Sequence, residues 1–258
     1  MLKNFTDLTG RVAVVIGGTS GLGRIIATGL AQAGADVVAS GRRMDLVEAV
    51  AADIEACGRR TARFAVDVSE RGSIDLLRDA AIHALGGVDV LVNAAGRTIK
   101  KPTMEMAQVE WEELMDTNLT GILRACQSFF PALKESGRGR LINIASLSSF
   151  VAFFEVAAYS ASKAAVLSLT RSLAIEWSRF GICVNAIAPG IFRTALNEDL
   201  LDGTERGREL LIRTPMGRFG RPEELVGAAV LLASDASSFI TGQCFTVDGG
   251  YLASGVNT

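Results

Sequence analysis

The sequence predicts an α/β protein built on a doubly wound, seven-stranded parallel sheet with helices on both faces. Three observations support this fold class. Short apolar runs alternate with longer segments of helical periodicity, the 27 glycines cluster where these segments meet, and only five prolines are present to interrupt helices. Chains in which strands and helices alternate form parallel βαβ units, whose right-handed crossovers favour a doubly wound sheet.

The first strand–helix unit sets the pattern. Residues 12–16 form a short run rich in β-branched side chains, as expected of a strand buried on both faces. A glycine-rich turn follows at 17–23. Apolar residues then recur at helical spacing up to Gly34, and glycine commonly follows the last residue of a helix.

The same alternation continues along the chain. Further strands are predicted at residues 36–40, 61–66, 88–92, 140–145, 182–188 and 244–247. Further helices are predicted at residues 43–57, 70–85, 107–134, 157–180 and 221–234. No linker, low-complexity stretch or close repeat interrupts this order, so residues 1–258 are expected to form a single domain.

The longest break in the alternation runs from about residue 190 to residue 220. It follows the sixth predicted strand and therefore lies at the carboxyl ends of the strands, where doubly wound sheets bind ligands. We expect this partly helical insertion to act as a substrate lid. The alternative is an ordinary surface excursion.

The composition argues against several classes of protein. The formal net charge is −2 and no long basic run occurs, which argues against nucleic-acid binding. No apolar run reaches the roughly 18 residues of a membrane span, and the first residues lack the apolar core of a signal peptide. We therefore expect neither a nucleic-acid nor a membrane partner.

The rare residues narrow the chemistry. The sequence has four cysteines, Cys57, Cys126, Cys183 and Cys244, and no two of them form a Cys-x-x-Cys pair. This spacing argues against a structural zinc site and against a disulfide framework. We therefore expect a reducing, cytoplasmic location. The single histidine, His83, lies in a predicted helix. A Ser-His-Asp triad and a multi-histidine metal site are thereby nearly excluded. We expect no metal, and acid–base chemistry must use another side chain.

The glycine-rich turn has the spacing Gly17-x-x-x-Gly21-x-Gly23, directly between the first strand and the first helix. Glycine permits unusual backbone angles and lets a pyrophosphate approach the amides of a helix N-terminus. The turn therefore predicts nucleotide binding, and its spacing is not that of a P-loop. The residues expected to contact the nucleotide here are Gly17, Thr19, Ser20, Gly21, Leu22 and Gly23.

The end of the second predicted strand bears on the choice of cofactor. An acidic residue there would bind the adenosine ribose hydroxyls of NAD, but the sequence has Ser40, Gly41, Arg42 and Arg43. Arginine side chains bind phosphate well, so Arg42 and Arg43 favour NADP(H), with NAD(H) possible. The alternative is that both arginines only begin a solvated helix.

A tyrosine and a lysine are paired on the helix predicted at 157–180. Tyr159 and Lys163 are four residues apart and therefore share a helix face. A phenol has a reference pKa of roughly 10, and a nearby ammonium group favours the phenolate and lowers that pKa. The pair predicts a general acid/base that needs no histidine. The alternative is an ordinary surface pair.

Together these features resemble the classical short-chain dehydrogenase/reductases, which have a Rossmann fold, over essentially the whole chain. Beyond the glycine turn and the Tyr–Lys pair, the matching motifs are Asp67-Val68, Asn93-Ala94-Ala95-Gly96, Asn118, Ser146, Pro189-Gly190 and Asp248-Gly249-Gly250. They occur in the family's order and at its spacing, so the resemblance is specific.

The resemblance implies a catalytic role for four residues. Tyr159 would exchange a proton with the substrate oxygen, and Ser146 would hydrogen-bond that oxygen. Lys163 would lower the Tyr159 pKa and bind the nicotinamide ribose, while Asn118 would hold a water that joins Lys163 to a proton relay. The alternatives are that Ser146 caps a loop and that Asn118 satisfies backbone groups.

The resemblance also implies further contacts with the cofactor. Asp67 would bind the adenine amino group, with the Val68 amide nearby. Asn93, Ala94, Ala95 and Gly96 would line the adenosine side of the cleft. Pro189, Gly190 and Thr194 would border the nicotinamide.

Two positions depart from the family pattern. Ile16 stands where the family commonly has threonine, so a local hydrogen bond is lost. Ser20 stands where NADP-preferring members often have a basic residue. The prediction of NADP(H) therefore depends mainly on Arg42.

The predicted function is an NADP(H)-dependent oxidoreductase that interconverts a ketone and a secondary alcohol. Residues 213–220 and 248–257 are similar to gluconate and deoxygluconate dehydrogenase-like members, which points to a sugar acid or polyol. The insertion has arginines that could meet a carboxylate, although acidic residues between them favour a solvated face. These arginines are Arg193, Arg206, Arg208 and Arg213.

Other readings stay open. Phe150, Phe153 and Phe154 suggest an apolar wall that fits a sugar acid poorly. Reduction of a 3-oxoacyl-carrier-protein is the first alternative, but those relatives usually have arginine at the position of Ile175. The second is a non-catalytic, nucleotide-binding regulatory protein.

The helices predicted at 107–134 and 157–180 carry more apolar residues than one sheet face needs. These include Phe129, Phe130, Val166, Leu169 and Leu173. In the family, the matching helices pair across subunits, so the resemblance implies a homotetramer. The alternative is that all of these residues belong to the internal core.

Overall fold

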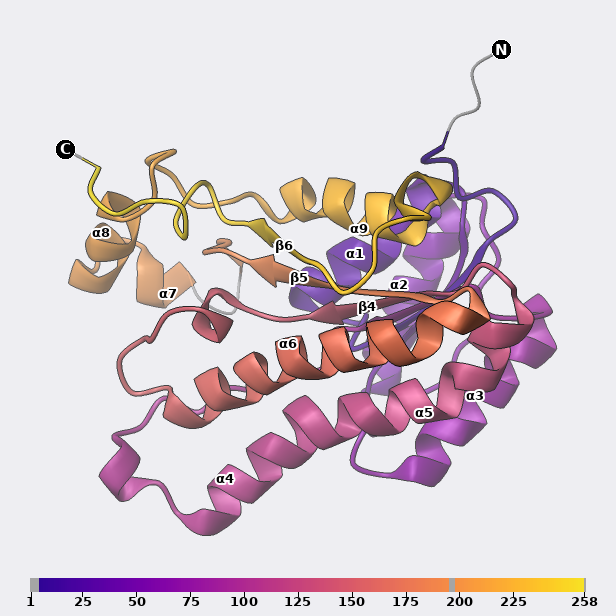
Figure 1. Ribbon diagram of the computed structural model, residues 1–258, viewed down its shortest axis with the longest axis horizontal. Coiled ribbons are helices and arrows are strands. Elements are labelled where there is room, and N and C mark those ends of the chain that lie inside the picture. The colour runs from indigo at the N-terminus through magenta and orange to yellow at the C-terminus, as the bar shows by residue number, and fades with distance from the viewer. Residues whose placement is uncertain (1–4, 195–197, 258) are drawn as a thin grey trace.

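A parallel sheet forms the centre of the molecule. The structure, a computed structural model, describes residues 5–194 and 198–257 (Figure 1). Within these ranges the sheet has six strands in the order β2-β1-β3-β4-β5-β6. They are β1 (Val12–Ile16), β2 (Asp36–Ser40), β3 (Val90–Asn93), β4 (Arg140–Ile144), β5 (Cys183–Pro189) and β6 (Cys244–Val247).

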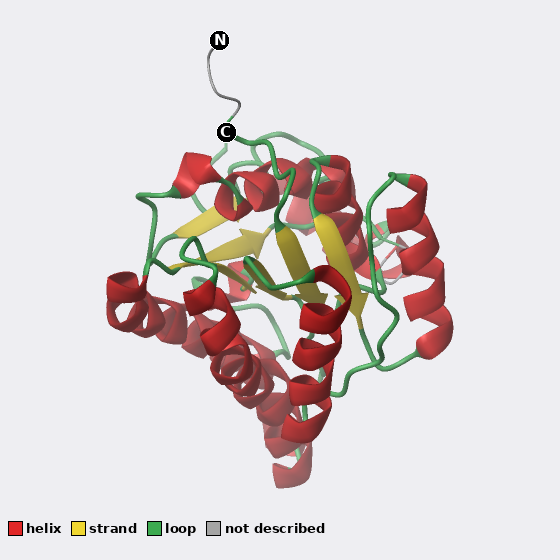
Figure 2. Cartoon of the chain, turned by 90° about the vertical axis from the view of Figure 1, so that its right-hand side faces the viewer, coloured by secondary structure: helices red, strands yellow, loops and turns green. Residues whose placement is uncertain are grey.

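Helices cover both faces of this sheet (Figures 1 and 2). One face carries α1 (Gly21–Gln32), α2 (Met44–Ala56) and α9 (Val226–Ala233). The other face carries α3 (Arg71–Leu85), α5 (Gly121–Glu135) and α6 (Ala157–Trp177). Successive strand residues point to opposite faces, so Val14 packs in one core cluster and Val15 in the other. The predicted α/β architecture is confirmed.

The sheet differs from the prediction at residues 61–66, which were expected to form a seventh strand. This segment runs beside β2, but it is joined to the β2 region by only one backbone hydrogen bond near each end of the segment. Val37 N donates to Arg60 O at 3.0 Å, and Val66 N donates to Gly41 O at 3.0 Å. Most of the segment is only half-buried, and its backbone does not form the regular hydrogen-bond ladder of a strand with β2.

The helix predicted at 107–134 is interrupted. It consists of α4 (Gln108–Met115), a π-helical turn at Asp116–Thr120, and α5. Similarly, the helix predicted at 221–234 begins with a 3-10 turn at Pro222–Leu225. A π turn widens the helix and releases backbone groups from the regular pattern, and such turns occur frequently at functional sites.

The predicted insertion contains two short helices, α7 (Glu198–Leu201) and α8 (Glu205–Ile212), at the carboxyl-end side of the sheet (Figure 1). A small apolar cluster holds α8 against the loop that follows β4 and against the C-terminal segment. Its buried members are Leu147, Leu201, Leu210 and Tyr251. Residues 195–197 of the predicted lid lie outside the described residues.

The sequence suggested that five apolar side chains on α5 and α6 contribute to a subunit interface. In the structure they pack in or against the core of the chain itself. Phe129, Val166 and Leu173 are buried in the core beneath α5 and α6, and Phe130 and Leu169 pack against it. Phe129, Val166 and Leu173 therefore belong to the internal core, whereas Phe130 and Leu169 remain partly exposed at its edge.

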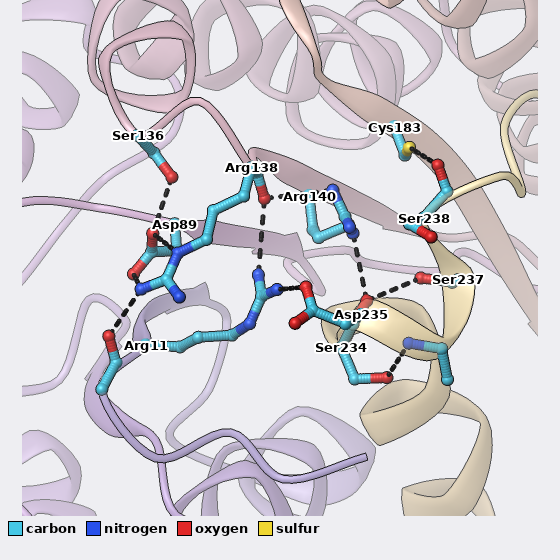
Figure 3. A network of polar contacts seen from close by, with 12 residues as sticks. Arg11, Asp89, Ser136, Arg138, Arg140, Cys183, Ser234, Asp235, Ser237 and Ser238 are labelled. Atoms are coloured by element: carbon cyan, nitrogen blue, oxygen red, sulfur yellow. Dashed lines mark hydrogen bonds and ion pairs between the residues drawn. The ribbon is translucent and has the colours of Figure 1, made fainter. Parts of the chain in front are cut away.

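A polar network closes the opposite, amino-end side of the sheet (Figure 3). The Asp89 carboxylate accepts hydrogen bonds from Val12 N at 2.8 Å, Ser136 Oγ at 2.6 Å and Arg138 Nε at 2.9 Å. Arg11, almost fully buried, forms an ion pair with Asp235. These polar groups are hydrogen-bonded or ion-paired with one another at the amino ends of β1 and β3. A ligand site is therefore expected at the carboxyl ends of the strands.

Candidate active site

A cavity of about 1010 Å³ opens at the carboxyl ends of the strands. Most of the residues that the sequence predicted for the site line it together. They are Gly17, Thr19, Ser20, Gly21, Leu22, Gly23, Arg42, Arg43, Asp67, Val68, Ala94, Ala95, Gly96, Ser146, Tyr159, Lys163, Pro189 and Gly190. Residues far apart in the sequence thus converge because parallel strands bring their carboxyl ends to one edge.

The glycine turn is packed too tightly for side chains. Gly17 has φ +82°, and a Cβ there would lie 2.3 Å from Ala95 N. A Cβ on Gly23 would lie 2.1 Å from Gly17 O. Ser20, the residue before α1, makes no side-chain capping bond. The first residues of α1, whose amides no Ser20 side chain caps, line the cavity, an arrangement that suits a pyrophosphate.

Arginine side chains lie at the β2 end of the cavity. Arg42 and Arg43 both line it, and within the described part of the chain neither forms an ion pair. Asp67 is the acidic residue nearby, and its carboxylate accepts hydrogen bonds from Ser69 N at 3.0 Å and Ser69 Oγ at 2.7 Å. These bonds, and secondarily the charge of Arg42, lower the pKa of Asp67. The arginines are left able to meet an anion.

The catalytic candidates meet beside β4. Lys163 Nζ donates a 2.7 Å hydrogen bond to Ile144 O and lies 5.8 Å from the Tyr159 ring centroid. Ser146 follows β4, lies close enough to the Tyr159 hydroxyl to lower its pKa, and its Oγ accepts a 2.9 Å hydrogen bond from Ser148 Oγ. A hydroxyl pair of this kind can bind one substrate oxygen and transfer a proton to it.

The pKa values of the pair are set by burial. Burial raises the pKa of the Tyr159 phenol, and the hydrogen bond with Ser146 lowers it by less. Burial also lowers the pKa of the Lys163 ammonium to about 8. Desolvation dominates the pKa of Tyr159, and the Lys163 ammonium is directed to the Ile144 carbonyl. That Lys163 lowers the Tyr159 pKa stays a prediction.

Asn118 lies behind the cavity wall rather than in it. It is fully buried on the π turn, where its Oδ1 accepts from Arg97 N at 2.8 Å. Its Nδ2 donates to Arg97 O at 2.9 Å and to Ser162 Oγ at 3.1 Å. A Cβ on Gly96 would lie 3.5 Å from Asn118 Oδ1 and 3.6 Å from Lys163 Nζ. The Asn118 side chain thus satisfies backbone groups, as the alternative reading held, and fixes the wall next to Lys163.

Two of the predicted cofactor contacts also fall outside the cavity lining. Asn93 is buried in the sheet, and its Nδ2 donates to Asn143 Oδ1 at 2.9 Å. Thr194 does not line the cavity, and its carbonyl accepts from Glu198 N at 3.1 Å. Asn93 is the last residue of β3, which is covered on both faces, so its side chain points into the core and not toward the cavity.

The substrate end of the cavity includes residues that the motifs did not single out. These are Arg97, Thr98, Ser148, Val156, Ile191 and Leu210, together with Phe153 and Arg206, which the sequence had suggested. Of the three phenylalanines expected to form an apolar wall, Phe153 lines the cavity, whereas Phe150 and Phe154 are exposed. These residues come from loops and α8, where no periodic pattern reports which side chains point inward.

Comparisons with known proteins match almost the whole chain. The family model described as Enoyl-(Acyl carrier protein) reductase matches residues 16–252. Gluconate 5-dehydrogenase of Gluconobacter oxydans is 38% identical over 248 residues, 96% of this chain and 97% of that protein. 2-dehydro-3-deoxy-D-gluconate 5-dehydrogenase of Dickeya dadantii is 38% identical over 256 residues, 98% of this chain and 100% of that protein.

A solved structure has the same fold throughout. The crystal structure of a gluconate 5-dehydrogenase from Burkholderia cenocepacia, in complex with NADP and tartrate, superposes with a TM-score of 0.93. It is 36% identical in sequence, and the match covers 98% of this chain and 99% of that one. By its motifs, its fold and its relatives, this chain belongs to the short-chain dehydrogenase/reductase family of oxidoreductases.

Proposed function

We propose that this protein is an NADP(H)-dependent oxidoreductase that interconverts a ketone and a secondary alcohol, with a sugar acid or polyol as substrate. The observation that carries the proposal is the convergence of Ser146, Tyr159 and Lys163 in one cavity, about 1010 Å³ in volume, with the glycine turn and two arginines. We expect residues 1–258 to form the single domain that holds this site.

The residues present fit a dinucleotide. Gly17 packs directly on the Ala95 backbone, and both residues line the cavity beside the N-terminus of α1, where a pyrophosphate would bind. Arg42 and Arg43 supply cations for a 2′-phosphate, and the Burkholderia cenocepacia relative was crystallised with NADP. When bound, the nicotinamide would supply or accept the hydride.

The remaining chemistry belongs to this chain. Ser146 and Tyr159 would hydrogen-bond the substrate oxygen, and Tyr159 would exchange a proton with it. Lys163 would bind the nicotinamide ribose and connect Tyr159 to solvent through a water held by the π turn at Asn118. With its side chain committed to Arg97, Asn118 would act through its backbone.

The relatives and the cavity support a sugar acid or polyol over the alternatives. Both curated relatives are named as dehydrogenases of gluconate or a deoxygluconate derivative. For 3-oxoacyl-carrier-protein reduction, an acidic carrier would need a cation where this chain has the exposed Ile175. The convergence of Ser146, Tyr159 and Lys163 on one cavity argues against a non-catalytic regulatory role.

The proposal also covers a substrate lid, the oligomeric state and the location of the protein. We expect residues 190–220 to cover substrate as a lid, because α8 contributes Arg206 and Leu210 to the cavity. We expect a homotetramer, a proposal supported by the family resemblance and by exposed apolar side chains on α4 and α6, such as Val109, Trp111 and Ile175. We expect a cytoplasmic location, and no helix in the described ranges is long and apolar enough to cross a membrane.

Absorbance at 340 nm tests the activity directly. Purified protein is assayed with NADPH or NADH against 5-ketogluconate, a 3-oxoacyl thioester and simple aryl ketones. Turnover of 5-ketogluconate with NADPH is expected. No turnover of any ketone despite cofactor binding would favour the regulatory role, and light scattering that shows a monomer would refute the tetramer.

The same assay tests cofactor choice. Arg42→Gln should raise KM for NADPH about 10- to 100-fold, because it removes a charge-assisted hydrogen bond to the 2′-phosphate. KM for NADH, which lacks that phosphate, is the internal control and should stay unchanged. Equal effects on both cofactors would refute the role of Arg42.

A further inference from the structure

The arginines of the insertion have different surroundings. Arg193 forms an ion pair of 2.6 Å with Asp202. Arg213 lies over the Tyr251 ring, with its guanidinium carbon 5.0 Å from the ring centroid. Neither lines the cavity. These two side chains have structural partners and are not presented to a ligand.

Arg206 and Arg208 lie on the same helix but face different environments. Arg208 is exposed and does not line the cavity, whereas Arg206 is half-buried and lines it. Among the described residues, the Arg206 side chain has neither an ion-pair nor a hydrogen-bond partner. An arginine that faces a cavity without a partner is able to accept an anionic ligand.

The other charges of the cavity do not balance Arg206. Arg97 is bonded to Glu113 at 3.0 Å, and Lys163 to the Ile144 carbonyl. The acidic residue of the described lining, Asp67, lies at the other end and interacts with Arg42. Within the described lining, the substrate end therefore carries cationic side chains and no carboxylate.

The packing of α8 fixes where Arg206 points. Leu210 is four residues later, so it shares the helix face of Arg206, and it too lines the cavity. Leu210 is buried in the cluster with Leu147, directly after Ser146. A Cβ on Gly207 would lie 1.8 Å from Leu201 O, so α7 and α8 are in direct backbone contact. Arg206 is thereby anchored relative to the loop that carries Ser146.

We propose that Arg206 binds a carboxylate of the substrate, which makes the substrate a hydroxy or keto acid rather than a neutral polyol. This inference rests on the oxidoreductase function proposed above. A guanidinium group binds a carboxylate through two parallel hydrogen bonds. The apolar walls formed by Phe153, Val156 and Ile191 strengthen that contact because they exclude water around it.

Steady-state kinetics with a matched pair of substrates tests the proposal. The pair is 5-ketogluconate and its neutral amide, assayed with saturating NADPH. Arg206→Gln should raise KM for the acid about 10- to 100-fold and leave KM for the amide unchanged. Arg206→Lys should recover part of the loss. Arg208→Gln, the exposed neighbour on the same helix, should leave both substrates unaffected.

Calorimetry separates this inference from the oxidoreductase function, since it needs no turnover. Gluconate is titrated into the wild-type protein and into Arg206→Gln, each saturated with NADPH. The wild type should bind it, and the variant should bind it about 10- to 100-fold more weakly. The proposal is overturned by no gluconate binding to the wild type, by equal affinities, or by an equal loss for acid and amide.

Discussion

The ammonium group of Lys163 donates a 2.7 Å hydrogen bond to the carbonyl oxygen of Ile144, the last residue of β4. This bond joins α6 to the strand end directly before the loop of Ser146. Because Tyr159 lies one turn before Lys163, the bond also fixes the distance between the two hydroxyls that would bind substrate. Lys163 therefore positions the site as well as supplying charge, and burial lowers its pKa to about 8.

That lowered pKa predicts a specific dependence of stability on pH. Between pH 8 and 10.5 the unfolded chain binds a proton at Lys163 that the folded chain has lost, so the free energy of unfolding rises with pH across this window. Below pH 8 both states are protonated and the contribution is constant. Relative to Lys163→Met, the wild type should gain about 3 kcal/mol across the window, at 1.36 kcal/mol per pKa unit.

Urea denaturation of both proteins at several pH values measures this difference. Tyr159 is a second titrating group, because burial raises its pKa above 10. The comparison is therefore repeated in a Tyr159→Phe background. A stability difference that stays flat from pH 7 to 10.5 in that background would contradict the lowered pKa of Lys163.

Tyr159 is the residue on which the proposed chemistry depends most. Tyr159→Phe removes the hydroxyl but keeps the ring, so kcat should fall about 10²- to 10⁴-fold while the Kd for NADPH stays unchanged. The chain has two tyrosines, and Tyr251, whose ring packs near that of Phe153, gives the matched control. Tyr251→Phe should retain activity. Stopped assays and fluorescence titration of NADPH measure the two quantities, and an active Tyr159→Phe enzyme would refute the assignment.

Most of the fold and much of the site could be predicted because they follow local rules. Strand–helix alternation, the glycine turn and the four-residue spacing of Tyr159 and Lys163 are each contained in a short stretch of sequence. The segment 61–66 misled because an apolar run does not report hydrogen bonding, and backbone bonds join this segment to the β2 region only near its ends.

The rest of the site depends on tertiary contacts. Asn118 matches its motif, yet its side chain is committed to Arg97, which follows from a π turn that no spacing rule reveals. The sequence could not separate Arg206 from the other arginines of the insertion either. Their difference comes from the packing of α8 through Leu210, a contact between segments distant in sequence.

The glycine turn gives a test with an unusually close control. Gly17 and Gly10 have similar backbone angles, φ +82° and +78°, so alanine at either position meets similar strain. A Cβ at Gly17 would lie 2.3 Å from Ala95 N, whereas nothing lies within 4 Å of a Cβ at Gly10. Gly17→Ala should therefore weaken NADPH binding at least about 10-fold, and Gly10→Ala should only lower stability, by about 1 kcal/mol. Isothermal titration of NADPH decides between them, and equal affinities in the two variants would contradict the close-approach argument.

The polar network at the amino ends of the strands should affect stability and leave catalysis intact. In Asp89→Asn, an amide replaces a carboxylate that accepts from Val12 N, Ser136 Oγ and Arg138 Nε, and an amide has a single acceptor oxygen. At least one partly buried donor then lacks a partner, which should cost about 1–3 kcal/mol of unfolding free energy. Asp79→Asn, which breaks the exposed pair with Arg78, is the control and should cost about 0–1 kcal/mol. The network lies at the end of the sheet opposite the cavity, so kcat should be unchanged in both variants. A loss of kcat in folded Asp89→Asn protein would contradict this and would mean that the two ends of the sheet are coupled.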